Sequence, residues 1–133
     1  MFKKILTFIW MLPQNILGIL ILFLLKGGKV DSYKDCDIYR VNVSGFSGGS
    51  FGRFIILEDA YFKREYMFVL ELTKRHEFGH YLQGKILGPL YLIIIGIPSM
   101  INNLRARIDI KVRDTYYTRY PENWADKLGE VKR

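Results

Sequence analysis

The feature that most constrains this chain is an apolar run over residues 5–25, a stretch of 21 residues without a charged side chain. A helix of that length spans roughly 30 Å, the thickness of a bilayer's hydrocarbon core. Pro13 interrupts the run, so a kinked transmembrane helix and a helical hairpin within one leaflet both fit. A cleaved signal peptide and a buried core helix are the alternatives, but the sequence at 26–29 lacks a cleavage pattern. We predict an N-terminal membrane segment over residues 1–29, containing a transmembrane helix, and a membrane localisation.

The rest of the chain has the length of one domain. There are 133 residues in all, and 50% of them are hydrophobic, which excludes intrinsic disorder. Residues 30–133 are therefore expected to form a single catalytic domain. Cys36 is the only cysteine, so the chain has no internal disulfide.

A second apolar run covers residues 86–101. As a helix its sixteen residues would reach about 24 Å, too short to cross a bilayer, and Pro89 and Pro98 shorten it further. We predict a re-entrant or interfacial membrane segment, with a buried core element as the alternative. The basic residues that follow suit lipid head groups: Arg105, Arg107, Lys111 and Arg113.

The net charge of +7 indicates an anionic partner, either a lipid surface or nucleic acid. No helix-turn-helix, zinc-finger or RNA-binding signature accompanies the basic residues, so we expect a lipid bilayer and no nucleic acid as partner.

Between the apolar runs, the sequence predicts an α+β fold. Residues 37–43 and 52–57 are rich in β-branched and aromatic residues, which predicts two antiparallel strands joined by a glycine-rich loop at 44–50. That loop lacks the Lys-Ser/Thr of a phosphate-binding loop. A helix is expected from about residue 60 to residue 83, with Asp59 as its N-cap and Gly84 just after its end. The small antiparallel sheet should pack on this helix and on a C-terminal helix.

The most informative motif lies on the predicted helix: His76-Glu77-Phe78-Gly79-His80, an H-E-x-x-H sequence. Side chains four residues apart lie on one helix face, so both imidazoles can reach one metal ion. Zinc accepts such nitrogen ligands in a tetrahedral shell. Glu77 then lies beside the metal position, where it can act as the catalytic base that takes a proton from water. The alternative is a surface helix with two incidental histidines.

A catalytic zinc needs three protein ligands and one open position. The chain has no third histidine, so the third ligand is a carboxylate or the Cys36 thiolate. The downstream carboxylates are Asp109, Asp114, Glu122, Asp126 and Glu130. Pro121 suits a first helical turn, which places Glu122 in that turn and Asp126 one turn later on the same face. We predict Glu122 as the third ligand and Asp126 as the carboxylate that accepts the other ring N–H of a ligand histidine.

Taken together, His76-Glu77-x-x-His80 and Glu122-x-x-Ala125-Asp126 resemble the H-E-x-x-H…E-x-x-A-D signature of the gluzincins, in particular the membrane-bound HtpX and CAAX-prenyl endopeptidases and the small soluble minigluzincins. The resemblance implies a zincin-like catalytic domain that binds zinc through His76, His80 and Glu122. It implies Glu77 as catalytic base and Asp126 as the residue that orients a histidine. It also implies that the strand at 53–57 offers its edge to an extended peptide substrate.

The position of the second apolar run constrains the topology. It lies between His80 and Glu122, and a single crossing would put a slab of roughly 30 Å between these two ligands. The run is therefore expected to return to the side that it left. The residues before Glu122 include four candidate donors to a substrate carbonyl oxygen, or else interfacial side chains: Tyr116, Tyr117, Arg119 and Tyr120.

These patterns predict a membrane-associated zinc metallopeptidase that hydrolyses a peptide or protein at the bilayer. The alternatives are a non-catalytic membrane-anchored structural or partner-binding protein and a basic protein that acts on membranes through charge. Glu77 separates the first two, because a structural metal site has no use for a carboxylate beside an open position.

Overall fold

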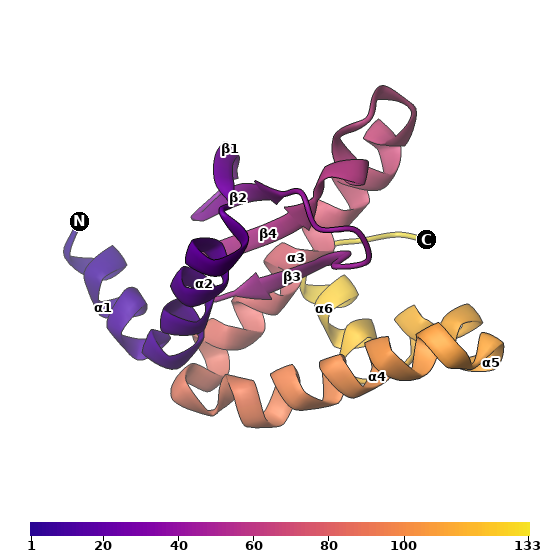
Figure 1. The fold of residues 1–133 in the computed structure, drawn as a ribbon. Helices are drawn as coiled ribbons and strands as arrows, with labels where there is room; N and C mark the ends of the chain where they lie inside the picture. Colours follow the sequence, from indigo (N-terminus) through magenta and orange to yellow (C-terminus); the bar gives the residue numbers. More distant parts are fainter.

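A computed structural model describes residues 1–133 as an α+β fold in which a four-stranded sheet lies between helices (Figure 1). The strands are β1 (Gly28–Tyr33), β2 (Cys36–Val41), β3 (Gly48–Phe51) and β4 (Phe54–Glu58). The helices are α1 (Phe2–Trp10), α2 (Leu12–Leu25), α3 (Met67–Leu87), α4 (Ile97–Ile108), α5 (Ile110–Asp114) and α6 (Glu122–Leu128). The predicted α+β class is confirmed.

The predicted antiparallel sheet is wrong, because the sheet is mixed, in the order β1-β2-β4-β3. β2 and β4 run parallel, while β1–β2 and β3–β4 are antiparallel. The cause is β3, which forms from residues expected to be loop and runs back along the outer side of β4. Gly48 allows this pairing, since a Cβ atom there would lie 2.7 Å from Leu57 Cδ2. Gly52 makes the turn into β4 with a φ of 63°, a conformation that favours glycine.

β4 is the central strand and is buried on both faces. Ile55 and Leu57 belong to the larger core cluster, which includes Met11 of the N-terminal segment and Phe78 of α3. The next residues along the strand alternate to the other face, where Ile56 packs with side chains of α2. Burial of one such aliphatic side chain stabilises the fold by about 2 kcal/mol. The sheet is thus held between α2 and α3.

The helix that carries the H-E-x-x-H motif is shifted from its predicted bounds. Asp59 begins a 3₁₀ turn (Asp59–Phe62) and its carboxylate accepts from Arg40 instead of capping the helix, which begins at Met67. Gly84 lies inside the helix, where a Cβ atom would be 2.4 Å from Met11 Cε. The chain turns away at Gly88, whose φ is 57°.

The N-terminal apolar run forms two helices instead of the predicted single transmembrane helix. α1 and α2 meet at an angle of 85°. Gln14 and Asn15 at the start of α2 are fully buried, and the Asn15 side chain donates to the Phe8 carbonyl at 3.0 Å. No helix in the structure is by itself both long and apolar enough to cross a bilayer; only α1 and α2 taken together reach that length and composition. Membrane localisation stays a prediction.

The second apolar run continues in helical form through a 3₁₀ turn (Gly88–Leu90), a π-helix (Leu92–Gly96) and α4. The change of helix type accommodates Pro98, which has no N–H to donate. Large apolar side chains on α4 are exposed: Ile97, Met100, Ile101, Leu104 and Ile108. After α5 the chain returns to α3, so that α6 packs beside it (Figure 1).

Candidate metal centre

α3 presents His76 and His80 one turn apart on a buried face. Their rings lie edge to face with centroids 4.8 Å apart, and each residue is about 5% exposed or less. The i, i+4 spacing aims both Nε2 atoms at the same point, as the motif predicts.

α6 brings Glu122 to that point. Its Oε2 atom lies 3.0 Å from His76 Nε2 and 2.9 Å from His80 Nε2, and its side chain is fully buried. One ligand atom from each of these three residues lies within 4.8 Å of the others, so the cluster could hold a metal ion. Ligands of a tetrahedral zinc ion lie about 3.3 Å apart, close to the two distances measured here.

The second ring nitrogen of each histidine is held by a different side chain. Asp126 Oδ1 lies 2.7 Å from His76 Nδ1, and Gln83 Oε1 lies 2.7 Å from His80 Nδ1. Acceptors at both Nδ1 atoms hold a proton on Nδ1, which is the arrangement in which Nε2 of each ring would bind a metal ion. Arg133 in turn holds Asp126 through two hydrogen bonds of 2.7 and 3.1 Å.

Two further contacts fix Glu122 and the start of α6. Ser99 of α4 donates from Oγ to Glu122 Oε1 at 2.5 Å, on the carboxylate oxygen that faces away from the imidazoles. Gln83 donates from Nε2 to the Pro121 carbonyl at 3.1 Å, so one amide positions both His80 and the turn before Glu122. The sequence alone indicates no role for Gln83 or Ser99. The i, i+3 spacing of His80 and Gln83 is the only signal that pointed to either.

The electrostatics of the cluster favour a bound cation. Burial raises the pKa of the Glu122 carboxyl, but hydrogen bonds from His76 and His80 outweigh burial and hold that pKa below its usual range. Asp126 behaves alike, since the hydrogen bonds from His76 and Arg133 overcome burial and lower its pKa. Burial lowers the pKa of His76, but its hydrogen bonds to Asp126 and Glu122 outweigh burial and raise that pKa to about 9, so a metal ion would displace the His76 proton on binding. Carboxylate with imidazole is a donor set that transition metals accept.

Glu77 lies next to the cluster without joining it. It is buried, and its Oε2 atom has no hydrogen-bond partner. Burial raises the pKa of the Glu77 carboxyl, although the nearby histidines oppose the shift. Glu77, His76 and His80 line one cavity of about 520 Å³ together with Tyr116. A carboxyl with an upward-shifted pKa that faces a cavity beside a metal position is placed to exchange protons there.

The other candidate ligands lie elsewhere. Cys36 is buried in the core between the sheet and α3. Asp109 caps α5 by accepting from the Lys111 N–H at 2.9 Å. Of the four candidate donors before Glu122, only Tyr116 lines the cavity. Tyr117 packs edge to face on His76, and the Tyr120 hydroxyl donates to the Ile94 carbonyl.

The expectation of an exposed strand edge at 53–57 is wrong for β4. β4 pairs with β2 on one side and β3 on the other, so it has no free edge. The free edge of the sheet beside the cavity belongs to β3, and all four residues of β3 line that cavity.

Protein-family models, curated proteins and solved structures were all compared with this chain, and none of them matches it.

Proposed function

We propose that this protein is a zinc-dependent peptidase of the gluzincin type that acts at a membrane surface. The observation that carries the proposal is the convergence of His76, His80 and Glu122 on one point, with the buried, unpartnered carboxyl of Glu77 facing the same cavity. His76, His80 and Glu122 would hold the ion, and zinc supplies a Lewis acid that polarises water and the scissile carbonyl group.

Glu77 has the protonation chemistry that peptide hydrolysis needs. Hydrolysis adds water to the carbonyl carbon and breaks the C–N bond, so one proton must move from water to the leaving nitrogen. Glu77 accepts that proton on its free Oε2 atom and then donates it to the amine. The raised pKa of its carboxyl suits this role, because a more basic carboxylate accepts a proton from water more readily.

Tyr116 is the residue we assign to the substrate carbonyl oxygen. It lines the cavity with the two histidines, and burial holds the pKa of its phenol well above the usual range. The hydroxyl therefore keeps its proton at neutral pH and can donate a hydrogen bond to developing negative charge.

An extended peptide fits the apolar cavity wall. The free edge of β3 can add one more strand to the sheet, which would hold a substrate backbone across the cavity. The wall also contains large apolar side chains from β3 and α4, among them Phe51 and Met100. A substrate with a bulky apolar side chain near the scissile bond fits this wall best.

The membrane part of the proposal rests on exposed apolar surface. α1 and α2 expose a series of large side chains, and so does α4. Basic residues lie in the first turn of α1 and the last turn of α4: Lys3, Lys4, Arg105 and Arg107. Apolar surface bordered by lysine and arginine suits the interface of an anionic bilayer.

The test combines metal content with hydrolysis. Wild type, Glu77→Gln and a control on the same helix, Glu71→Gln, are purified in detergent, reconstituted with zinc and incubated with a randomised decapeptide library. We expect one zinc per chain in all three, and new peptide termini from wild type and the control but not from Glu77→Gln. Cleavage by Glu77→Gln, or no cleavage by zinc-loaded wild type, contradicts the peptidase assignment. Loss of zinc in His80→Ala and Glu122→Ala checks the ligand set separately.

A further inference from the structure

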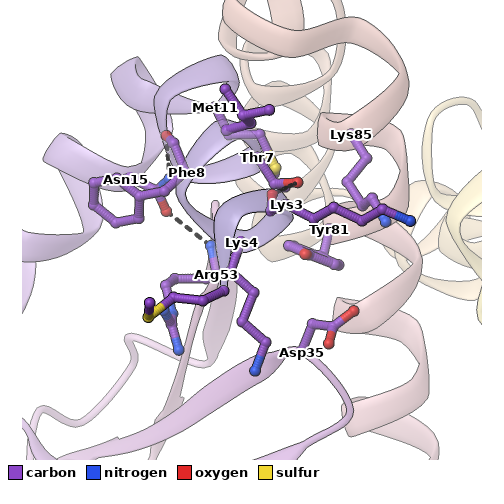
Figure 2. A pocket seen from close by; sticks show the side chains of 12 residues that line it. Lys3, Lys4, Thr7, Phe8, Met11, Asn15, Asp35, Arg53, Tyr81 and Lys85 are labelled. Carbon is purple, nitrogen blue, oxygen red and sulfur yellow. Dashed lines mark hydrogen bonds between the residues drawn. The ribbon is translucent and has the colours of Figure 1, made fainter.

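A second cavity, of about 550 Å³, lies between α1, the end of α3 and the turn before β4 (Figure 2). It shares no lining residue with the cavity at the metal cluster. Four basic side chains line it: Lys3 and Lys4 from α1, Arg53 from the turn before β4, and Lys85 from α3. We refer to it as the basic cavity.

The positive charge of the basic cavity is poorly compensated. Lys3, Lys4 and Lys85 form no salt bridge, and Asp35 is the single carboxylate in the lining. Arg53 pairs with Asp37 through Nη2 at 3.0 Å, but its Nε atom is buried without a hydrogen-bond partner. Three lysines without a salt bridge, beside a single carboxylate in the lining, attract an anion.

Tyr81 adds a hydroxyl to the same wall. Its side chain lies along the cavity below Lys3 and Lys85 in Figure 2, and the residue is only 5% exposed. The hydroxyl makes no side-chain hydrogen bond within the chain but keeps some solvent exposure, so it is free to donate to a group bound in the cavity. Burial raises the pKa of the phenol to about 12, so it stays a donor at neutral pH.

Most of the remaining wall is apolar, and this apolar part continues onto exposed surface. Leu6, Phe8 and Met11 line the basic cavity, and α1 exposes Ile5 and Ile9 beside it. A small inorganic anion would leave this apolar wall exposed to water. A phosphate group that carries acyl chains matches both halves of the lining.

We propose that the basic cavity binds the phosphate head group of an anionic phospholipid. The four basic side chains and the Tyr81 hydroxyl donate hydrogen bonds to the phosphate oxygens, and the acyl chains lie on the apolar face of α1. The site fixes α1 at the membrane interface and orients the rest of the molecule there. The proposal does not depend on the peptidase activity.

Native mass spectrometry of the detergent-purified full chain tests this site. Phosphatidylglycerol, phosphatidylcholine and inorganic phosphate are titrated separately. The pocket variant is Lys4→Gln with Lys85→Gln, and the control is Lys63→Gln with Lys127→Gln, which removes the same charge from exposed positions outside the basic cavity. Tyr81→Phe removes the hydroxyl alone, and thermal midpoints confirm that every variant folds.

We expect one phosphatidylglycerol per chain, bound about tenfold more tightly than phosphatidylcholine, because several charge-assisted hydrogen bonds are gained. The pocket variant should lose roughly tenfold in affinity, Tyr81→Phe about threefold, and the control nothing. Equal losses in the pocket variant and the control would overturn the proposal in favour of diffuse surface charge. Inorganic phosphate that binds as tightly as the lipid would assign the cavity to a soluble phosphate. Equal affinity for phosphatidylglycerol and phosphatidylcholine would show that the cavity does not recognise the anionic head group, which contradicts the proposal.

Discussion

Gly79 of α3 lies against Ala125 of α6 so closely that a Cβ atom at Gly79 would be 1.9 Å from the Ala125 carbonyl oxygen. The two free positions of the H-E-x-x-H motif are therefore not equivalent, since one of them must lack a side chain. This contact sets the distance between the helix that carries His76 and His80 and the helix that carries Glu122.

Gly79→Ala should destabilise the protein although alanine is the better helix former. Alanine gains about 1 kcal/mol of helix propensity, but the clash must push α6 away and costs about 1–3 kcal/mol beyond that gain. Metal affinity should fall as Glu122 moves. Denaturant unfolding and zinc competition measure both effects. Gly28→Ala is the control, because a Cβ atom there meets nothing within 4 Å, and it should stay close to wild type.

Metal removal should lower stability through mass action. A ligand at a concentration 100 times its Kd stabilises the folded state by about 2.7 kcal/mol if the unfolded chain does not bind it. Zinc should therefore raise the thermal midpoint of wild type, and EDTA should reverse the rise. His80→Ala should show no zinc-dependent change. A rise of the same size in His80→Ala would place the bound metal at some other site.

Gln83 should matter for both the metal site and the fold. Gln83→Met keeps the volume but leaves His80 Nδ1 and the Pro121 carbonyl without their partner, and each buried unpaired group costs about 1–3 kcal/mol. Loss of such support for a metal ligand lowers metal affinity roughly 10–100-fold. Leu82→Met, at the preceding position on α3, is the matched control. Equal zinc affinities in the two variants would show that Gln83 does not position His80.

Ser99 connects the apolar segment to the metal cluster through one hydroxyl. Ser99→Ala leaves Glu122 Oε1 buried without a donor, so zinc affinity should fall about tenfold, as for other outer contacts of metal ligands. Ser99→Thr keeps the hydroxyl and should restore most of the affinity. If alanine and threonine weaken zinc binding alike, the effect comes from packing of α4 and not from the hydrogen bond.

The parts of this structure that the sequence predicted are those with local signals. The i, i+4 histidines follow from helix geometry, and Pro121 located the start of α6 to within one residue. The motif helix begins at Met67 and not near residue 60, because Tyr61 and Phe62 pack on the core from a 3₁₀ turn. Local propensity does not distinguish these two outcomes.

The parts that were missed depend on distant contacts. β3 has only four residues, two of them glycine, and it becomes a strand because β4 supplies its hydrogen-bond partners. Ser99 carries no charge and sits in an apolar run, so its contact with Glu122 depends on how α4 returns to the cluster. Gln14 and Asn15 follow the proline that interrupts the first apolar run, and the sequence does not indicate that both side chains are fully buried.

The burial of Asn15 can be tested by mutation, because its side chain connects α2 with α1 and with the turn before β4. Its amide nitrogen donates to the Phe8 carbonyl of α1 at 3.0 Å, and its carbonyl oxygen accepts from the Arg53 N–H at 2.9 Å. Asn15→Leu leaves both backbone groups unpaired and should cost about 2–4 kcal/mol. Asn15→Asp keeps the acceptor for Arg53 and should lose less.

The same contact should fix the 85° bend between α1 and α2. Spin labels at exposed cysteines in place of Leu6 and Phe23 report the distance between the two helices, and the native Cys36 is buried and should not react. Wild type should give a narrow distance distribution and Asn15→Leu a broad one with longer distances, since the Asn15 side chain links the end of α1 to the turn before β4 by hydrogen bonds. An unchanged narrow distribution in Asn15→Leu would mean that Pro13 and the packing of α2 on the sheet set the bend. Gln14 and Asn15 would then stabilise the domain without fixing the orientation of α1.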